Sequence, residues 1–172
     1  MSRRGISNVV ATIILIAVAI ALAVAVAVWV FGLAGSAAKT ATLTVVQGSL
    51  TVTSSGTPSG LTFVINNPTG ASISLSGFTL GSLSCTFQTP LPIPGGTTNG
   101  QLQIEFSTGS SGIGGSATLN GGTSYSFSCT GSQSFYAGVQ YSGSLITTSG
   151  QTYPFTVTAE QTSSSGSGGS GG

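Results

Sequence analysis

The chain has 172 residues, of which only 3% are charged, and its formal net charge at pH 7 is +1. It contains three basic residues, two acidic residues and no histidine. This composition offers no basic patch for nucleic acid, and it lacks the histidine that catalytic triads and most zinc sites use. It therefore argues against a nucleic-acid-binding protein and against an enzyme, and it predicts no catalytic residue, metal or cofactor.

The amino-terminal segment combines a short basic leader with a long apolar run. The leader is residues 1–5, and residues 6–38 follow it without one charged residue. A helix of about 33 residues would be ~50 Å long, whereas ~20 residues cross the hydrocarbon core of a membrane. Alanine favours helix, and a single strand in lipid would leave its backbone groups unpaired. We predict one helix over 6–38.

Between Ala17 and Val28 this run alternates alanine with larger apolar residues. Residues two apart on a helix differ by ~200° in direction, so the larger side chains fall into two opposite sectors with alanines between them. Such a surface suits a helix packed against copies of itself, although a lone membrane anchor is the alternative. The residues expected to form a packed filament core are Val9, Ile13, Ile16, Ile20, Val24, Val28 and Phe31.

Three polar residues lie near the start of the apolar run. Ser7 is a candidate N-cap, and Asn8 and Thr12, four residues apart, share one helical face. The Thr12 hydroxyl is expected to donate to a backbone carbonyl of the preceding turn. Simple capping of the helix near a polar interface is enough to explain the presence of all three residues.

The sequence Arg3-Arg4-Gly5 followed by Ile6-Ser7-Asn8-Val9-Val10-Ala11-Thr12 resembles the class III signal peptide of archaeal type IV pilins. The resemblance covers roughly the first forty residues. It implies that a membrane prepilin peptidase cuts between Gly5 and Ile6, and that the apolar helix stays on the mature subunit. Bacterial pilins carry a glutamate early in this helix and archaeal pilins commonly lack it, so its absence here favours the archaeal branch. Asn8-Val9 stands where many archaeal pilins have a Ser-Pro pair, so the subfamily stays open.

The resemblance also implies partners and a location. The precursor would sit in the cytoplasmic membrane, meet the pilus assembly machinery, and polymerise with its own copies into an adhesive filament at the cell surface. An archaellin, the subunit of the archaeal motility filament, is the nearest alternative. A single-span surface binding protein that never assembles is an alternative of a different class.

The pattern of residues 39–162 predicts a head domain built from strands. Together with the amino-terminal helix, this domain gives the chain an α+β fold class. Short alternating runs between Gly, Ser, Asn and Pro turns are typical of an all-β fold, and their spacing favours an immunoglobulin-like sandwich over a barrel. Pro90, Pro92 and Pro94 are expected to mark one exposed loop. The strands are predicted at 42–53, 61–66, 73–80, 83–88, 101–106, 124–130, 134–141, 144–148 and 152–159.

Large apolar residues on these runs predict the core of the head. The sequence from Gly112 to Gly115 is expected to form a turn. The core candidates are Leu61, Phe63, Ile65, Phe78, Phe87, Ile104, Phe106, Phe127, Phe135, Tyr141 and Phe155.

Cys85 and Cys129 are the two cysteines of the chain, and both fall on predicted strands. In an extracellular domain one disulfide is the expected pairing, with two buried thiols as the alternative. Residues 163–172 have the Ser/Gly composition of a flexible linker. The many serines and threonines make O-glycosylation of an exposed surface a hypothesis.

Overall fold

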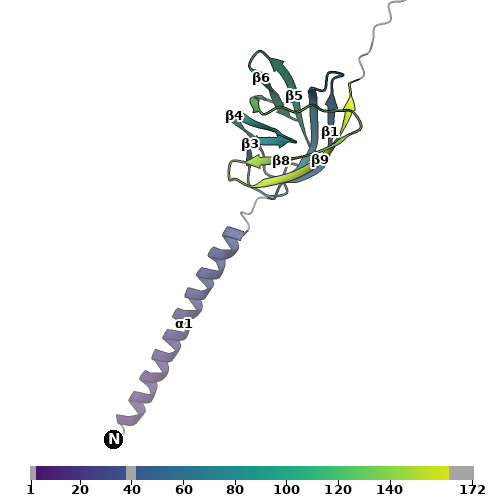
Figure 1. Ribbon diagram of the computed structural model, residues 1–172. Coiled ribbons are helices and arrows are strands. Elements are labelled where there is room, and N and C mark those ends of the chain that lie inside the picture. The colour runs from purple at the N-terminus through teal and green to yellow at the C-terminus, as the bar shows by residue number, and fades with distance from the viewer. Residues whose placement is uncertain (1–2, 38–41, 163–172) are drawn as a thin grey trace, which may run out of the picture. The chain divides into compact units, whose positions relative to one another are not determined.

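The computed structural model describes residues 3–37 and 42–162 of the chain. Within them the chain forms one helix and nine strands, and it divides into two compact units between Thr40 and Ala41. Helix α1 (Arg3–Ala37) makes up the first unit, and all the strands belong to the second (Figure 1). The predicted long helix and strand-rich head are therefore confirmed. We use "head" for residues 42–162.

Most strands of the head overlap the predicted runs, and two of them, β3 and β7, have the predicted bounds. The strands are β1 (Thr44–Val52), β2 (Pro58–Asn66), β3 (Ile73–Leu80), β4 (Leu83–Ile93), β5 (Gly100–Gly109), β6 (Gly112–Leu119), β7 (Ser124–Thr130), β8 (Gln140–Thr147) and β9 (Thr152–Gln161).

Alternation places one face of each strand inside the head. In β2, Leu61, Phe63 and Ile65 are buried, while Thr62 between them is exposed. The period of two along a strand explains this pattern, since successive side chains point to opposite faces of the sheet. The predicted core is confirmed: of its eleven members, Phe106 is half-buried and the others are buried.

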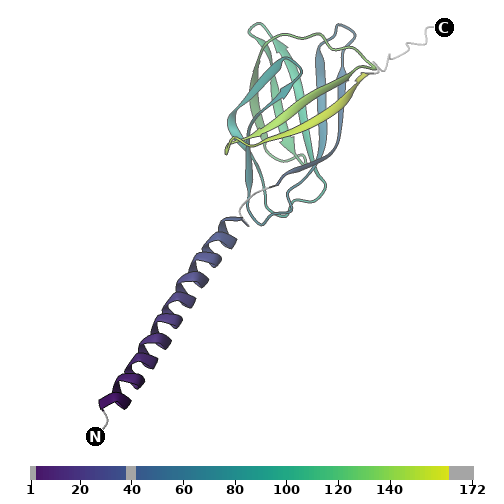
Figure 2. The same ribbon diagram turned by 60° about the horizontal axis from the view of Figure 1, so that its bottom comes forward.

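The strands join edge to edge into one closed sheet, in the order β1-β2-β5-β6-β7-β4-β3-β8-β9 (Figure 2). Neighbours pair antiparallel, except that β1 and β9 pair parallel from Leu50 with Ala159 to Val52 with Gln161. That parallel pairing closes the ring. The predicted immunoglobulin-like sandwich is therefore wrong at the level of topology, and the head is a nine-stranded barrel.

Strand spacing could not distinguish the two architectures. A sandwich and a small barrel both bury every second residue and need turns at similar intervals. They differ in the pairing of their edge strands. A sandwich leaves the edges of its sheets unpaired, whereas in a closed barrel the first and last strands of the sheet pair with each other. The contact between β1 and β9 joins residues about 110 positions apart, and no local pattern announces it.

The predicted proline loop is wrong for Pro90 and Pro92, which lie inside β4, whereas Pro94 lies in the exposed loop that follows this strand. Leu91 and Ile93 alternate with them and are buried. The pairing of β4 with β7 ends at Phe87, so the later part of β4 has only β3 as a neighbour. Proline lacks an N–H donor and is tolerated where a strand has such a free edge.

The expected turn at Gly112–Gly115 belongs instead to β6, and the chain reverses at Ser110 and Ser111. Gly115 pairs with Phe127 of β7, whose ring packs against the glycine: a Cβ atom there would lie 2.8 Å from the Phe127 Cζ. Gly115 thus makes room for the Phe127 ring. Between Ile113 and Leu119 this strand carries only small side chains and one threonine, so its sequence gives no clear alternation of polar and large apolar residues.

The predicted strand at 134–141 is largely a loop, and β8 begins at Gln140. Phe135 is nevertheless buried in that loop and packs its ring against Tyr141, with centroids 4.8 Å apart. The Phe135 N–H donates to the Gly56 carbonyl at 2.9 Å, and the Tyr136 N–H donates to the Tyr141 hydroxyl oxygen at 2.8 Å. These bonds satisfy the backbone N–H groups of Phe135 and Tyr136 without pairing to a neighbouring strand.

Candidate functional site: the exposed apolar helix

Helix α1 carries residues 3–5 of the predicted leader and the predicted filament core on one continuous element, whereas leader residues 1–2 lie outside the described residues (Figure 1). Arg3, Arg4 and Gly5 form its first turn and Ile6 follows directly, so no break in the helix marks the predicted cleavage position. The part from Gly5 to Gly32 is long and apolar enough to cross a membrane. An amino-terminal signal sequence has the same character, so this finding is compatible with a signal or an anchor.

The seven predicted core residues lie along one side of α1. They recur at intervals of three or four residues, which on a helix with 3.6 residues per turn places them on a single broad face. All are exposed, from 55% for Ile16 to 76% for Phe31. The face is therefore continuous and uncovered in a single copy of the chain.

From Ile13 to Val28 the remaining sides of the helix are equally apolar. Leu15, Leu22 and Trp29 project away from that face and are each more than 60% exposed. Soluble proteins rarely leave so large an apolar surface in water, and a helix that is apolar all round is normally enclosed by protein or lipid. The surface of α1 is thus suited to burial on every side.

The polar residues near the start of α1 are partly accounted for within the helix. The Thr12 hydroxyl donates to the Asn8 carbonyl oxygen at 2.6 Å. This confirms the expected bond to the preceding turn, which lets a hydroxyl enter an apolar environment. Thr12 needs no further partner to be buried.

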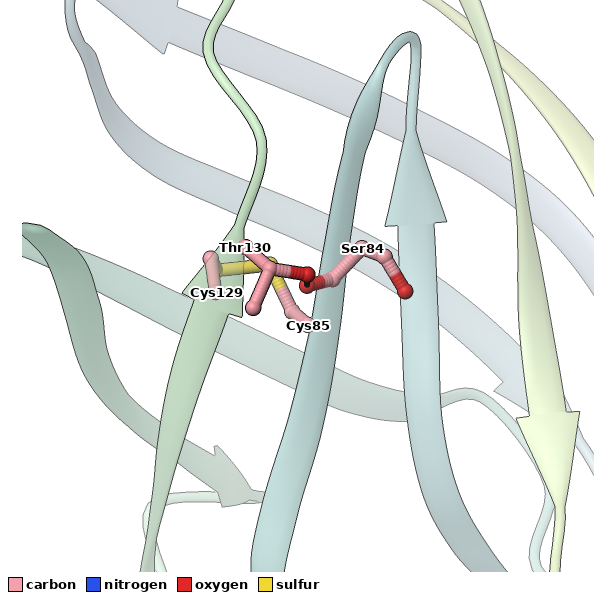
Figure 3. The surroundings of a disulfide bond; sticks show 4 residues. All are labelled: Ser84, Cys85, Cys129 and Thr130. Atoms are coloured by element: carbon pink, nitrogen blue, oxygen red, sulfur yellow. Dashed lines mark hydrogen bonds between the residues drawn. A yellow bond between two sulfur atoms is a disulfide. The ribbon is translucent and has the colours of Figure 1, made fainter.

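In the head, Cys85 and Cys129 form a disulfide (Figure 3). They are directly opposite each other on neighbouring strands β4 and β7, and their Cα atoms are 4.0 Å apart. Beside them the Thr130 hydroxyl donates to the Ser84 carbonyl at 3.4 Å. The bond closes a 44-residue separation that contains β5 and β6, so it ties two segments distant in sequence.

The two carboxylates of the head, Glu105 on β5 and Glu160 on β9, lie in one cross-strand row. Gly60 of β2 and Thr51 of β1 stand between them. Three strand spacings of ~4.8 Å separate the two positions by about 14 Å. Glycoside hydrolases, which use paired carboxylates, hold them ~5–9.5 Å apart. Within residues 3–37 and 42–162, no group of three or more His, Cys, Asp or Glu side chains is placed to hold a metal ion.

One surface feature of the head escaped the sequence reasoning. The strands β1 and β9 pair only at their carboxyl-terminal ends, and before that point a shallow groove separates them. Val46 lies at this groove in a β-bulge and is 62% exposed. The doublet Val45-Val46, which breaks the alternation of the run, is the available signal for a bulge. The groove is lined by Val45, Val46, Gly48, Pro154, Phe155 and Thr156.

No model of a known protein family matches this chain, and a search of the curated proteins finds no relative.

Proposed function

We propose that this protein is the major structural subunit of an archaeal type IV adhesive pilus. In this proposal the leader is cut between Gly5 and Ile6, helices from many copies bundle at the filament core, and heads form the outer layer. The observation that carries the proposal is helix α1, whose apolar surface is uncovered on every side while the head of the same chain buries its own.

The driving force for assembly is the burial of that helix. Apolar surface removed from water contributes roughly 25 cal/mol per Å², and lipid covers it equally well before assembly. A helix that carries no charged side chain between Gly5 and Gly32 can therefore move from bilayer to filament core without burying a charged side chain, and its polar side chains before Trp29 are confined to Ser7, Asn8 and Thr12 near its start. Contacts of this kind between different faces of identical subunits do not close, and they generate an open helical polymer.

The head supports the proposal by its composition. Lys39, Glu105 and Glu160 are the charged residues that would remain after cleavage, for a side-chain charge of +1 − 2 = −1. The outer faces of β1, β2 and β5 carry hydroxyl and amide side chains, such as the Ser49 and Thr62 hydroxyls 2.6 Å apart. Nearly uncharged heads pack at high density around a core with little mutual repulsion.

The test is to shear native cells and to image and analyse the detached material. We expect filaments in which this chain is the main protein, with a helical core and β heads outside in a reconstruction. Recovery of the chain only as detergent-extracted monomers from the membrane would contradict the proposal and favour a single-span surface protein. A filament that rotates with the swimming machinery would identify the archaellin alternative.

A further inference from the structure

The polar side chains of the apolar part of α1 are concentrated at one end. Between Gly5 and Gly32 the helix carries Ser7, Asn8 and Thr12, and then no polar side chain until the indole of Trp29. We refer to Ser7, Asn8 and Thr12 as the polar cluster. It covers ~7.5 Å of the helix axis, and Asn8 and Trp29 are ~31 Å apart along the same axis, at 1.5 Å per residue.

Asn8 differs from its neighbour Thr12 in how its side chain is satisfied. The Thr12 hydroxyl is bonded within its own helix, whereas the Asn8 amide makes no hydrogen bond to any residue that the structure describes. This amide offers two N–H donors and one carbonyl acceptor. Asn8 is exposed on the surface of α1. It therefore brings unused hydrogen-bonding capacity to whatever covers the helix.

In a bilayer that capacity is met by water and lipid headgroups. Asn8 lies three residues, or ~4.5 Å, inside the start of the Gly5–Gly32 segment. The segment is ~42 Å long, against a hydrocarbon core of ~30 Å, so its first turn and a half can sit in the interface. In a filament core there is no headgroup layer, and buried amides in proteins are hydrogen-bonded with few exceptions.

We infer that Asn8 fixes the axial register between packed copies of α1 by hydrogen-bonding to the polar cluster of a second copy. This inference rests on the proposed filament. The second copy is the fitting partner because its helix offers the same cluster and, apart from the distant Trp29, no other polar side chain in the apolar segment. A single asparagine in an otherwise apolar helix interface sets register in coiled coils by the same physics. Contacting helices would then be offset along their axes by no more than the ~7.5 Å length of the cluster.

A helical reconstruction of sheared native filaments tests the inference directly. We expect the Oδ1 or Nδ2 atom of Asn8 within ~3.2 Å of a polar atom of Ser7, Asn8 or Thr12 of another copy. An Asn8 amide that faces only apolar side chains, or a water-filled or lipid-filled channel, would overturn it. A native chain that forms no filaments at all would instead refute the proposed function.

Variants supply an independent measurement. Asn8→Leu removes the amide and keeps the branched shape of the side chain, Asn8→Gln keeps an amide, and Val10→Leu is the matched apolar control. We expect Asn8→Leu to yield fewer filaments or filaments whose axial rise varies from segment to segment, while Asn8→Gln and Val10→Leu keep one uniform rise. The amino terminus of each variant is determined alongside, so that failure of leader cleavage is recognised. Cleaved Asn8→Leu that forms filaments as uniform as the native ones would overturn the inference.

Discussion

The apolar residues of the helix are exposed, whereas the large apolar residues of the head are mostly buried. Phe78 in the head is 0% exposed and packs edge-on against Phe106 and Phe127, at centroid distances of 6.0 and 5.2 Å. Phe31 near the end of α1 is 76% exposed. One chain thus contains a unit that supplies its own core and a unit whose core must come from outside.

This difference separates two kinds of stability. The free energy of the head comes from contacts within one copy, together with one disulfide. The free energy of burying α1 depends on lipid or on other copies, and it therefore depends on protein concentration, as for any assembly. A substitution in the head is expected to leave the burial of α1 unchanged, and a substitution in α1 is expected to leave the free energy of unfolding of the head unchanged.

The largest expected effect is from a charge at the middle of α1. Val18 lies halfway between Gly5 and Gly32, and an aspartate at the centre of a membrane-spanning helix costs about 2.5–3.5 kcal/mol. We expect Val18→Asp to abolish filaments in every shear preparation, because each copy brings this cost to the core. Val18→Leu is the matched control and should assemble normally. Regular filaments of Val18→Asp would mean that this position is not packed between helices.

The second effect concerns the disulfide of the head. Removing a cross-link across 44 residues is expected to cost about 4 kcal/mol of stability, because the unfolded chain gains the conformational entropy that the closed loop had restricted. The double variant Cys85→Ala, Cys129→Ala should lower the free energy of unfolding of the head by this amount, measured by denaturant titration of the full chain in detergent. The helical signal of α1 should not change. Equal unfolding midpoints for variant and native chain would contradict the assigned role.

A smaller effect is expected where the rings pack onto β1. A Cβ atom added at Gly48 would lie 2.7 Å from Cδ1 of Phe63 and 2.8 Å from Cγ1 of Val157, both buried side chains. Gly48→Ala should therefore destabilise the head by about 1–3 kcal/mol through overpacking. Gly70→Ala has open space around the new Cβ and serves as control. Similar unfolding midpoints for both variants would show that the barrel wall yields freely at Gly48.

The smallest effect is expected from pH. The chain has no histidine and two acidic residues, Glu105 and Glu160, so few side chains can couple proton binding to unfolding. The unfolding midpoint of the head is expected to stay nearly constant between pH 7 and pH 3. A steep fall across that range would reveal a coupling that the composition does not indicate.

The sequence predicted well what is decided locally. An uninterrupted apolar run specifies α1, and alternation specifies the buried face of strands such as β2 and β3, because both patterns follow from backbone period. The same reasoning placed Cys85 and Cys129 on strands, although it could not show that β4 and β7 are neighbours.

The sequence failed where distant segments meet. Barrel closure depends on β1 pairing with β9, and β6 is held by the Phe127 ring packing onto Gly115. Pro90 and Pro92 predict a loop when the sequence alone is considered. They fit inside β4 because its pairing with β7 ends at Phe87, which the local sequence does not show. For the candidate site, the apolar character of α1 was evident from the sequence. That the Asn8 side chain makes no hydrogen bond to a residue that the structure describes became evident only from the structure, beside the Thr12 bond.

The amino-terminal residue of the assembled protein tests the central proposal most directly. It can be determined by mass spectrometry of material sheared from native cells. The account predicts a chain that begins at Ile6, with the whole helix from that residue onward retained in the filament. A chain that begins at Met1 in the membrane fraction, or one that begins near Ala37 in the medium, would contradict it.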